Sequence, residues 1–276
     1  MDDMSITVRK KNKLDVLHYG SCDELINDLR AIETFLDDML YISLGRNCIL
    51  CGKLTFSLQH VLVSVELTMG SIISCCESAC IADAYSLLRK YRDDLFFYLY
   101  VTVYNADRSF DDKDKRIKDM ENNIARWLED GLSNFNSSFL LKSISTSPSL
   151  SDSVVKFKLK QSFDNIGKRL NNYVHSNGFS FYNMGYSAYK DFKASLESLI
   201  NDAKYITISF LFLLILSSPA SIMSTDYIDY CECGLIPPEG SQYTVAPFVE
   251  KFIGSHIKMI DDNCLAYLKE NTSMQL

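Results

Sequence analysis

Apolar residues recur every three to four positions along most of the chain, which is the spacing of helices that bury one face. The clearest early case follows Ser21, a residue type that commonly caps the start of a helix. The apolar positions in this segment are Leu25, Leu29, Ile32, Phe35, Leu36, Met39 and Leu40. They predict an amphipathic helix over residues 22–44, followed by a break between Gly45 and Gly52.

The rest of the chain predicts about six more helices. Residues 54–103 contain no proline and one glycine, so they fit two long helices joined near residues 75–81. Further helices are expected over 111–131, from a cap at 152 or 153 to 174, over 188–216 and over 246–269. The first 20 residues alternate in character and indicate either an irregular segment or a short strand pair.

Nine serines and Pro148 lie between residues 133 and 153, and this composition predicts a loop. With no convincing strand ladder, the chain is expected to form an all-α, multi-helix bundle of about seven helices. We predict an N-terminal segment with the first helix over residues 1–52, followed by a helical domain over residues 53–276. A single domain over 1–276 is the alternative, because one large bundle can accommodate this length.

Residues 205–224 carry no charge over 20 positions, which is the length of a membrane-spanning helix. The segment also contains five serines, one threonine and Pro219, and charged residues lead into it on a helical pattern. A buried central helix explains these features better than a membrane span. The start of the chain shows no secretory signal, and the nine cysteines indicate reduced thiols. We therefore expect a cytoplasmic protein with no membrane partner.

Cys48 and Cys51 have the spacing of half a zinc site. The nearest second half is Cys231 and Cys233, whose spacing is poor for zinc and which lack a nearby histidine. Two unrelated pairs of free thiols are the favoured interpretation, so neither a metal nor a cofactor is expected. The sequence also lacks a phosphate loop, a dinucleotide-binding fingerprint, and the HExxH and GxSxG motifs.

The segment KRLNNYVHSNG, residues 168–178, carries the candidate chemistry. Arg169 and His175 lie near an expected helix end, with Asn171 and Asn172 between them. RNA can be cut without metal when its own 2′-hydroxyl attacks the adjacent phosphorus, which requires a group that titrates near neutrality and a fixed cation. Histidine supplies the first and arginine the second. On a straight helix the two point about 120° apart, so the alternative is a solvated arginine and a helix-capping histidine.

Basic residues gather around this segment although the chain is acidic, with a formal net charge of −7. Residues 153–178 contain a single acid, Asp164. Their cations are Lys156, Lys158, Lys160, Lys168 and Arg169. This patch over residues 156–169 predicts contact with RNA or a nucleotide, and the alternative is a solvated basic face.

Two further arginines, Arg89 and Arg92, lie in a strongly apolar segment. A buried charge is costly without a partner. We expect ion pairs with Glu66, Glu77 or Asp94, and the alternative is that both arginines line the same phosphate-binding cleft.

The spacing Arg169-x5-His175 near a helix end, in an all-helical chain, resembles the R-x(4–6)-H motif of the HEPN superfamily. The phrase LNNYVHSNG is similar to an LxxYVHxN-type stretch of bacterial HEPN-like toxins and phage-defence proteins. The segment DAYSLLRKYRDDLFFYL, residues 83–99, resembles a family helix with an LLR core. The order of the helices extends this likeness over residues 55–215.

The resemblance implies a helical bundle, a homodimer whose two motifs face each other, and endoribonuclease activity. Arg169 would then bind and stabilise the phosphate, and His175 would act as acid or base. Asn172 would hold the phosphate or His175. The remaining expected contacts to phosphate or RNA are Asn171, Lys168, Arg92 and Arg89.

We therefore predict a metal-independent endoribonuclease that acts as a toxin or abortive-infection effector in phage defence, with an antitoxin or defence-system protein as a further partner. The position after Arg169 is Leu170, where catalytic members of the family usually carry a polar residue. The alternative from a different class is a non-catalytic module that binds a partner protein or a nucleotide through the same groove. A third interpretation is a nucleotidyl-handling accessory whose motif only contacts phosphate.

Overall fold

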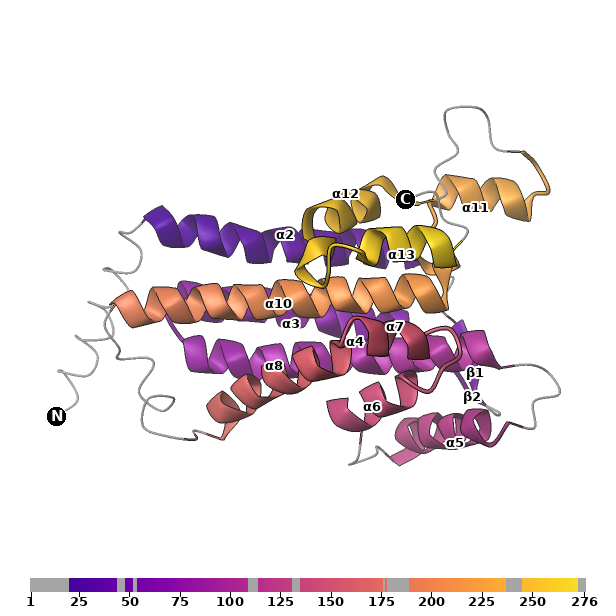
Figure 1. The fold of residues 1–276 in the computed structure, drawn as a ribbon, viewed down its shortest axis with the longest axis horizontal. Coiled ribbons are helices and arrows are strands. Elements are labelled where there is room, and N and C mark those ends of the chain that lie inside the picture. Colours follow the sequence, from indigo (N-terminus) through magenta and orange to yellow (C-terminus); the bar gives the residue numbers. More distant parts are fainter. Residues whose placement is uncertain are drawn as a thin grey trace.

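The computed structural model describes residues 20–43, 48–51, 54–108, 114–130, 135–175, 177, 189–236 and 245–272. Over these residues the protein is an all-α, multi-helix bundle with one small β-hairpin (Figure 1). The longer helices are α2 (Gly20–Ser43), α3 (Gln59–Glu77), α4 (Ile81–Asp107), α5 (Lys115–Asp130), α8 (Leu159–Val174) and α10 (Tyr189–Ser217). The shorter elements are α6 (Ser137–Ile144), α7 (Ser151–Lys156), η2 (Pro219–Ile222), α11 (Thr225–Glu232), α12 (Pro247–His256), η3 (Ile257–Met259) and α13 (Cys264–Asn271).

Helix α4 lies at the centre of the bundle. It contacts α3, α10, α8 and α6, and α2 packs against α3 and α10. Every residue from Leu95 to Tyr104 is buried, so this half of α4 is covered on all sides. A helix that is buried all round requires a neighbour on each face. The other helices therefore pack around α4, as Figure 1 shows.

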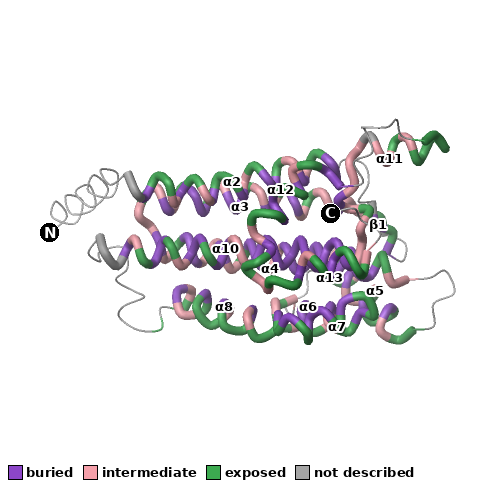
Figure 2. Tube along the Cα trace, turned by 45° about the horizontal axis from the view of Figure 1, so that its top comes forward, coloured by how far each residue is buried: buried purple, intermediate pink, exposed green. Residues whose placement is uncertain are grey.

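The uncharged end of α10 packs inside the protein, as the interpretation of a buried central helix predicts. Residues 206–216 are all buried, and Figure 2 shows this run along α10. Thr207 within it shares a hydrogen bond of 2.7 Å with the hydroxyl of Tyr91 in α4. Among the described helices, Gln59–Glu77 and Phe192–Ser217 are long and apolar enough to cross a membrane. Of their apolar stretches, 44% and 83%, respectively, are buried inside the protein.

A small β-hairpin follows α2. Its first strand lies in the predicted break between residues 45 and 52, and its second strand occupies residues 54–57, where a helix was expected to begin. β1 (Cys48–Cys51) pairs antiparallel with β2 (Leu54–Ser57), and Ile49 lies opposite Phe56. Ile49 is buried and Phe56 contacts Trp127 of α5, so the hairpin covers the bundle beside α5. Each strand has four residues, which is too short for an alternating pattern to stand out in the sequence.

The cysteines considered as zinc ligands occupy different environments. Cys51 is buried in β1, and burial raises the pKa of its thiol to about 11. Cys231 and Cys233 are exposed at the end of α11. The described part of the chain contains no group of three histidine, cysteine, aspartate or glutamate side chains that could hold a metal ion.

Over its described residues, 135–153, the serine-rich segment is not the continuous loop that its composition predicts. It contains α6 and the first residues of α7. Asn136 caps α6 by accepting a hydrogen bond of 3.0 Å from the backbone N–H of Phe139, and Leu140 is buried against the core. The described residues therefore form more helices than expected, and the predicted C-terminal helix is divided into α12, η3 and α13.

Helix α2 belongs to the same buried core as the helices that follow it. It packs against α3, α10 and α12. Residues 1–19, where the sequence predicts an irregular segment or a strand pair, lie outside the described residues. The division of the chain into residues 1–52 and 53–276 stays a prediction.

Glu66 of α3 lies in an acidic environment beside α2. Burial raises the pKa of Glu66 above its usual 4.5, and the charges of Glu33 and Asp37 raise it further. A carboxyl with a raised pKa holds its proton more tightly in the folded state, so stability falls as the pH rises from 4.5 through the raised pKa. We expect Glu66→Gln to increase the free energy of unfolding at pH 7 by about 0.5 kcal/mol, a small gain because solvent screens the three charges.

Urea denaturation at acidic and neutral pH measures this effect. Glu77→Gln in the same helix is the control. Glu77 forms an ion pair with Arg30 at 2.6 Å, so removal of its charge is not expected to stabilise the folded protein. A Glu66→Gln variant that is less stable than the natural chain at pH 7 would show that the Glu66 carboxylate makes a favourable contact.

Candidate functional site

Helix α8 carries most of the predicted site residues. Lys158, in the left-handed backbone region with a φ of 51°, separates it from α7. One face of α8 is buried against the core through Leu159, Phe163, Ile166, Leu170 and Tyr173. The buried position of Leu170 explains why this residue is apolar. The remaining positions form an exposed face and two flanks. One flank faces α10, and the other faces α4 and α6.

Arg169 occupies the flank that faces α10. Its guanidinium grips the carboxylate of Asp202 with two hydrogen bonds: Nε donates to Oδ2 at 2.9 Å and Nη2 donates to Oδ1. The side chain of Asp202 is 6% exposed, whereas that of Arg169 is 45% exposed. The hydrogen bonds to Asp202 raise the pKa of Arg169 above its usual value. The cation is therefore fixed in place and still reaches solvent.

Two stacked tyrosines lie beside this ion pair. The rings of Tyr85 in α4 and Tyr173 in α8 are 3.8 Å apart and nearly parallel. The Tyr85 hydroxyl donates to the carbonyl of Ser195 in α10 at 3.3 Å. These contacts join α4, α8 and α10 and hold the backbone that carries Arg169.

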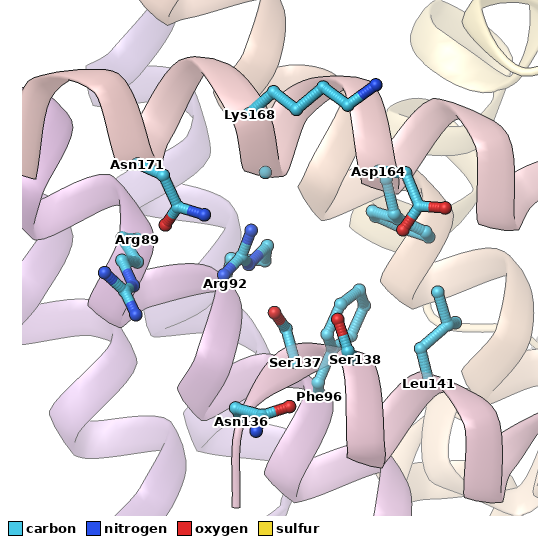
Figure 3. A pocket seen from close by; sticks show the side chains of 12 residues that line it. Arg89, Arg92, Phe96, Asn136, Ser137, Ser138, Leu141, Asp164, Lys168 and Asn171 are labelled. Atoms are coloured by element: carbon cyan, nitrogen blue, oxygen red, sulfur yellow. The ribbon is translucent and has the colours of Figure 1, made fainter. Parts of the chain in front are cut away.

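A groove of about 560 Å³ lies along the opposite flank of α8, between α4 and α6 (Figure 3). Arg89 and Arg92 enter it from α4, and Lys168 and Asn171 enter it from α8. Figure 3 shows the hydroxyls of Ser137 and Ser138, at the start of α6, pointing into the space between α6 and α8. The lining of the groove is completed by Phe96, Asn136, Leu141, Phe163, Asp164 and Gly167.

Arg92 is the most buried cation of the groove, with a side chain that is 5% exposed. Its Nε and Nη2 both donate to Oδ1 of Asp93, at 3.0 and 2.7 Å. The Nη1 atom lies 3.2 Å from the position that a Cβ on Gly167 would occupy. The glycine therefore leaves space at this edge of the guanidinium, which faces the groove.

The predicted partners of the two arginines were wrong, although the expectation of ion pairs was right. Arg89 approaches Asp93 at 3.9 Å, so both arginines share this one carboxylate. Burial raises the pKa of Asp93, and the charges of Arg92 and Arg89 oppose that rise. Asp94, which the sequence offers as a partner, pairs with Lys90 instead. Both arginines also line the groove, so pairing and groove lining occur together.

The groove has a positive electrostatic character. Its lining contains the three cations Arg89, Arg92 and Lys168 and one acid, Asp164, which is exposed and pairs with Lys160 at 3.3 Å. The carboxylate of Asp93 offsets one of the two arginine charges, and the cations still outnumber the acids. The first turn of α6 adds backbone N–H groups that have no partner within a helix and carry the positive end of its dipole. Such an arrangement attracts anions, and phosphate oxygens match both the arginine and the N–H donors.

His175 ends α8 and is exposed. Its backbone N–H donates to the carbonyl of Asn171 at 3.0 Å. Because residues four apart on a helix differ by about 40° in direction, His175 follows the stripe of Lys168 and Asn171 rather than that of Arg169. It does not itself line the groove but lies one turn beyond Asn171, where the groove side of α8 ends.

Asn172 fixes the chain after this helix end. Its carbonyl accepts from the backbone N–H of Asn177 at 2.9 Å, and its side-chain oxygen accepts from the Asn177 amide at 3.3 Å. Asn172 is therefore engaged with its own chain and holds the turn that carries His175. The expected contact of Asn172 with phosphate stays a prediction.

The structure brings together four of the predicted residues, Arg89, Arg92, Lys168 and Asn171, and sets Arg169 on the other flank of α8. A common cleft for Arg169 and His175 within one chain stays a prediction. Sequence reasoning missed Asp202 as the partner of Arg169 and missed the start of α6. The second had a detectable signal, because an asparagine three residues before an apolar helical run is a capping pattern.

Comparisons with known proteins do not place the chain in a family. No family model, curated protein or solved structure matches it significantly. The likeness to the HEPN superfamily therefore continues to rest on the Arg169-x5-His175 spacing and its flanking segments.

Proposed function

We propose that the protein binds RNA along the groove between α4, α6 and α8 and cleaves it without a metal, as a HEPN-like endoribonuclease. The observation that carries the proposal is the gathering of Arg89, Arg92 and Lys168 in one groove, with His175 on the next turn along the same side of α8. This places an imidazole, which can accept or donate a proton, beyond a set of phosphate ligands. The biological role that we propose is that of a toxin or abortive-infection effector in the cytoplasm.

The reaction needs one proton acceptor and one proton donor. The 2′-oxygen forms a bond to phosphorus while the bond from phosphorus to the 5′-oxygen breaks, which leaves a 2′,3′-cyclic phosphate and a free 5′-hydroxyl. His175 is the candidate that removes the 2′-hydroxyl proton or delivers a proton to the leaving 5′-oxygen. Arg169 is the candidate that stabilises the charged phosphorus centre, because Asp202 fixes it in orientation.

A second subunit would resolve the separation of these two residues. Arg169 and His175 point to different sides of α8, so each phosphate would meet both groups if two copies of residues 168–175 faced each other. We propose a two-fold dimer for this reason. Light scattering at micromolar concentration is expected to give about twice the chain mass of 31.5 kDa. A mass of 31.5 kDa with RNA cleavage intact would mean that each chain builds its site alone.

The second candidate function is non-catalytic binding of RNA or a nucleotide. The observation in its favour is that Arg169 is engaged with Asp202 and does not line the groove. In this case the groove binds phosphate, but the histidine contributes nothing to bond cleavage. The two functions differ in their products, because only the first releases a cyclic phosphate.

RNA binding is expected to weaken when groove cations are removed. Lys168→Gln and Arg89→Gln should each raise the Kd for a short single-stranded RNA by about 5-fold and make binding less dependent on salt. Fluorescence anisotropy at two salt concentrations measures both effects. Lys258→Gln is the matched control, because Lys258 is exposed on η3, outside the groove, and should leave the Kd unchanged. Equal losses in all three variants would show that binding follows net charge rather than the groove.

A further inference from the structure

A second cavity of about 730 Å³ lies on the other side of α6 from the groove. Phe139, Lys142 and Ser143 of α6 face this cavity, whereas Ser137, Ser138 and Leu141 face the groove. Its other walls come from α4 and α5. The two sites therefore share a helix but no lining residue, and they can be tested separately.

The wall from α4 holds a buried hydroxyl that forms no hydrogen bond of normal geometry. Tyr100 has no exposed surface, and no described residue forms a hydrogen bond of normal geometry with its hydroxyl. Burial raises the pKa of this hydroxyl to about 12, and a side-chain hydrogen bond with Asn123, which falls outside normal geometry, opposes the rise. A buried donor with a poorly formed hydrogen bond destabilises the folded state, and a bound acceptor would reduce that cost.

The lining of the cavity contains four cations and one acid, Asp119, so positive charge predominates. Lys115, Arg126 and Lys142 are exposed, and no described acid forms an ion pair with any of them. The fourth cation, Arg116, is already paired with Asp107 at 2.9 Å. The rim can therefore offer three cations to a ligand, and a polyanion matches them better than a single carboxylate does.

The interior of the cavity is apolar and aromatic. Phe139 and the buried side chain of Met120 line it together with the ring of Tyr100, whose centroid is 6.2 Å from that of Phe139. The amides of Asn122 and Asn123 lie among these lining residues and can both donate and accept hydrogen bonds. The volume is that of a site for a small organic molecule.

We propose that this cavity binds an organic phosphate with a planar aromatic body. The phosphate oxygens lie among Lys115, Arg126 and Lys142, and the aromatic body packs on Phe139, where it accepts a hydrogen bond from the Tyr100 hydroxyl. This site is independent of RNA cleavage, because it uses no residue of α8.

Calorimetric titration of the full chain tests the site, with ADP as the probe and with adenosine and pyrophosphate as its two halves. We expect ADP to bind at least about ten times more tightly than either half, since the cavity contacts both parts. Arg126→Gln and Lys142→Gln, both at exposed positions, should each raise the Kd for ADP about 5-fold. Lys258→Gln, at an exposed position outside both the groove and this cavity, is the matched control and should leave it unchanged. Lys168→Gln reports any binding of ADP in the groove instead.

Tyr100→Phe separates a binding role from a structural one. Without ligand, its melting temperature should equal or exceed that of the natural chain, because the lost hydroxyl forms no hydrogen bond of normal geometry. With ADP, its Kd should rise about 5-fold. The proposal is overturned if ADP does not bind at millimolar concentration, if Lys168→Gln rather than Arg126→Gln weakens it, or if Tyr100→Phe melts lower and binds ADP normally.

Discussion

Replacement of His175 by alanine is expected to slow RNA cleavage by about 10²–10⁴-fold, which is the range for loss of a general acid or base. RNA affinity should change little, because the groove cations remain. Thermal stability should also stay the same, because His175 is exposed and its backbone hydrogen bond does not depend on the side chain. Single-turnover cleavage and anisotropy, measured on one preparation, separate the two effects.

The matched control for this variant is His60→Ala. His60 is likewise an exposed histidine, but it lies on α3, outside the groove. Its replacement should leave cleavage unchanged. If both variants cleave at the natural rate, His175 has no part in catalysis and the proposed role of this residue is wrong. The non-catalytic binding function requires instead that the natural chain binds RNA without cutting it.

Replacement of Arg169 by alanine is expected to lower the free energy of unfolding by about 3 kcal/mol, because it leaves a buried carboxylate without its partner. Asp202 is 6% exposed and accepts two hydrogen bonds from Arg169, so solvent replaces them poorly. The double variant Arg169→Ala/Asp202→Ala should recover more than half of the loss, because the unpaired charge is gone. Urea denaturation of both variants measures this difference.

Loss of RNA cleavage in the Arg169→Ala variant would have two possible causes. The variant has lost a side chain that would contact the phosphate, and it has also lost the ion pair that holds α8 against α10. The double variant distinguishes the two causes, since it restores stability without restoring the cation. If the single variant is as stable as the natural chain, solvent reaches Asp202 more easily than its burial implies.

The bundle could be predicted because its evidence is local. The recurrence of apolar residues every three to four positions after Ser21 predicts α2. The uncharged run that includes Ile206 predicts a buried α10. The start of α6 was missed because only Leu140, Leu141 and Ile144 supply its apolar face, and serines dominate the surrounding composition. Tertiary packing of those few residues decides the conformation of this segment.

The site was predictable in part for the same reason. Lys168 and Asn171 lie on one side of a recognisable helix, and α4 brings Arg89 and Arg92 against them. The link from Arg169 to an acid 33 residues away depends on how α8 packs on α10, and spacing along the sequence cannot show it. Sequence spacing alone also could not show whether His175 lies on the side of α8 that carries Lys168 or on the side that carries Arg169.

The most direct measurement of the central claim is cleavage of a defined RNA in the presence of EDTA, compared with the same strand carrying one 2′-deoxynucleotide at the cleaved position. We expect the RNA to be cut to a 2′,3′-cyclic phosphate and a 5′-hydroxyl, the deoxy-substituted strand to survive at that position, and Lys168→Gln to cut more slowly at low RNA concentration. Uncut RNA that still binds with groove-dependent affinity, or cleavage of the deoxy-substituted position, would contradict cleavage by attack of the 2′-hydroxyl.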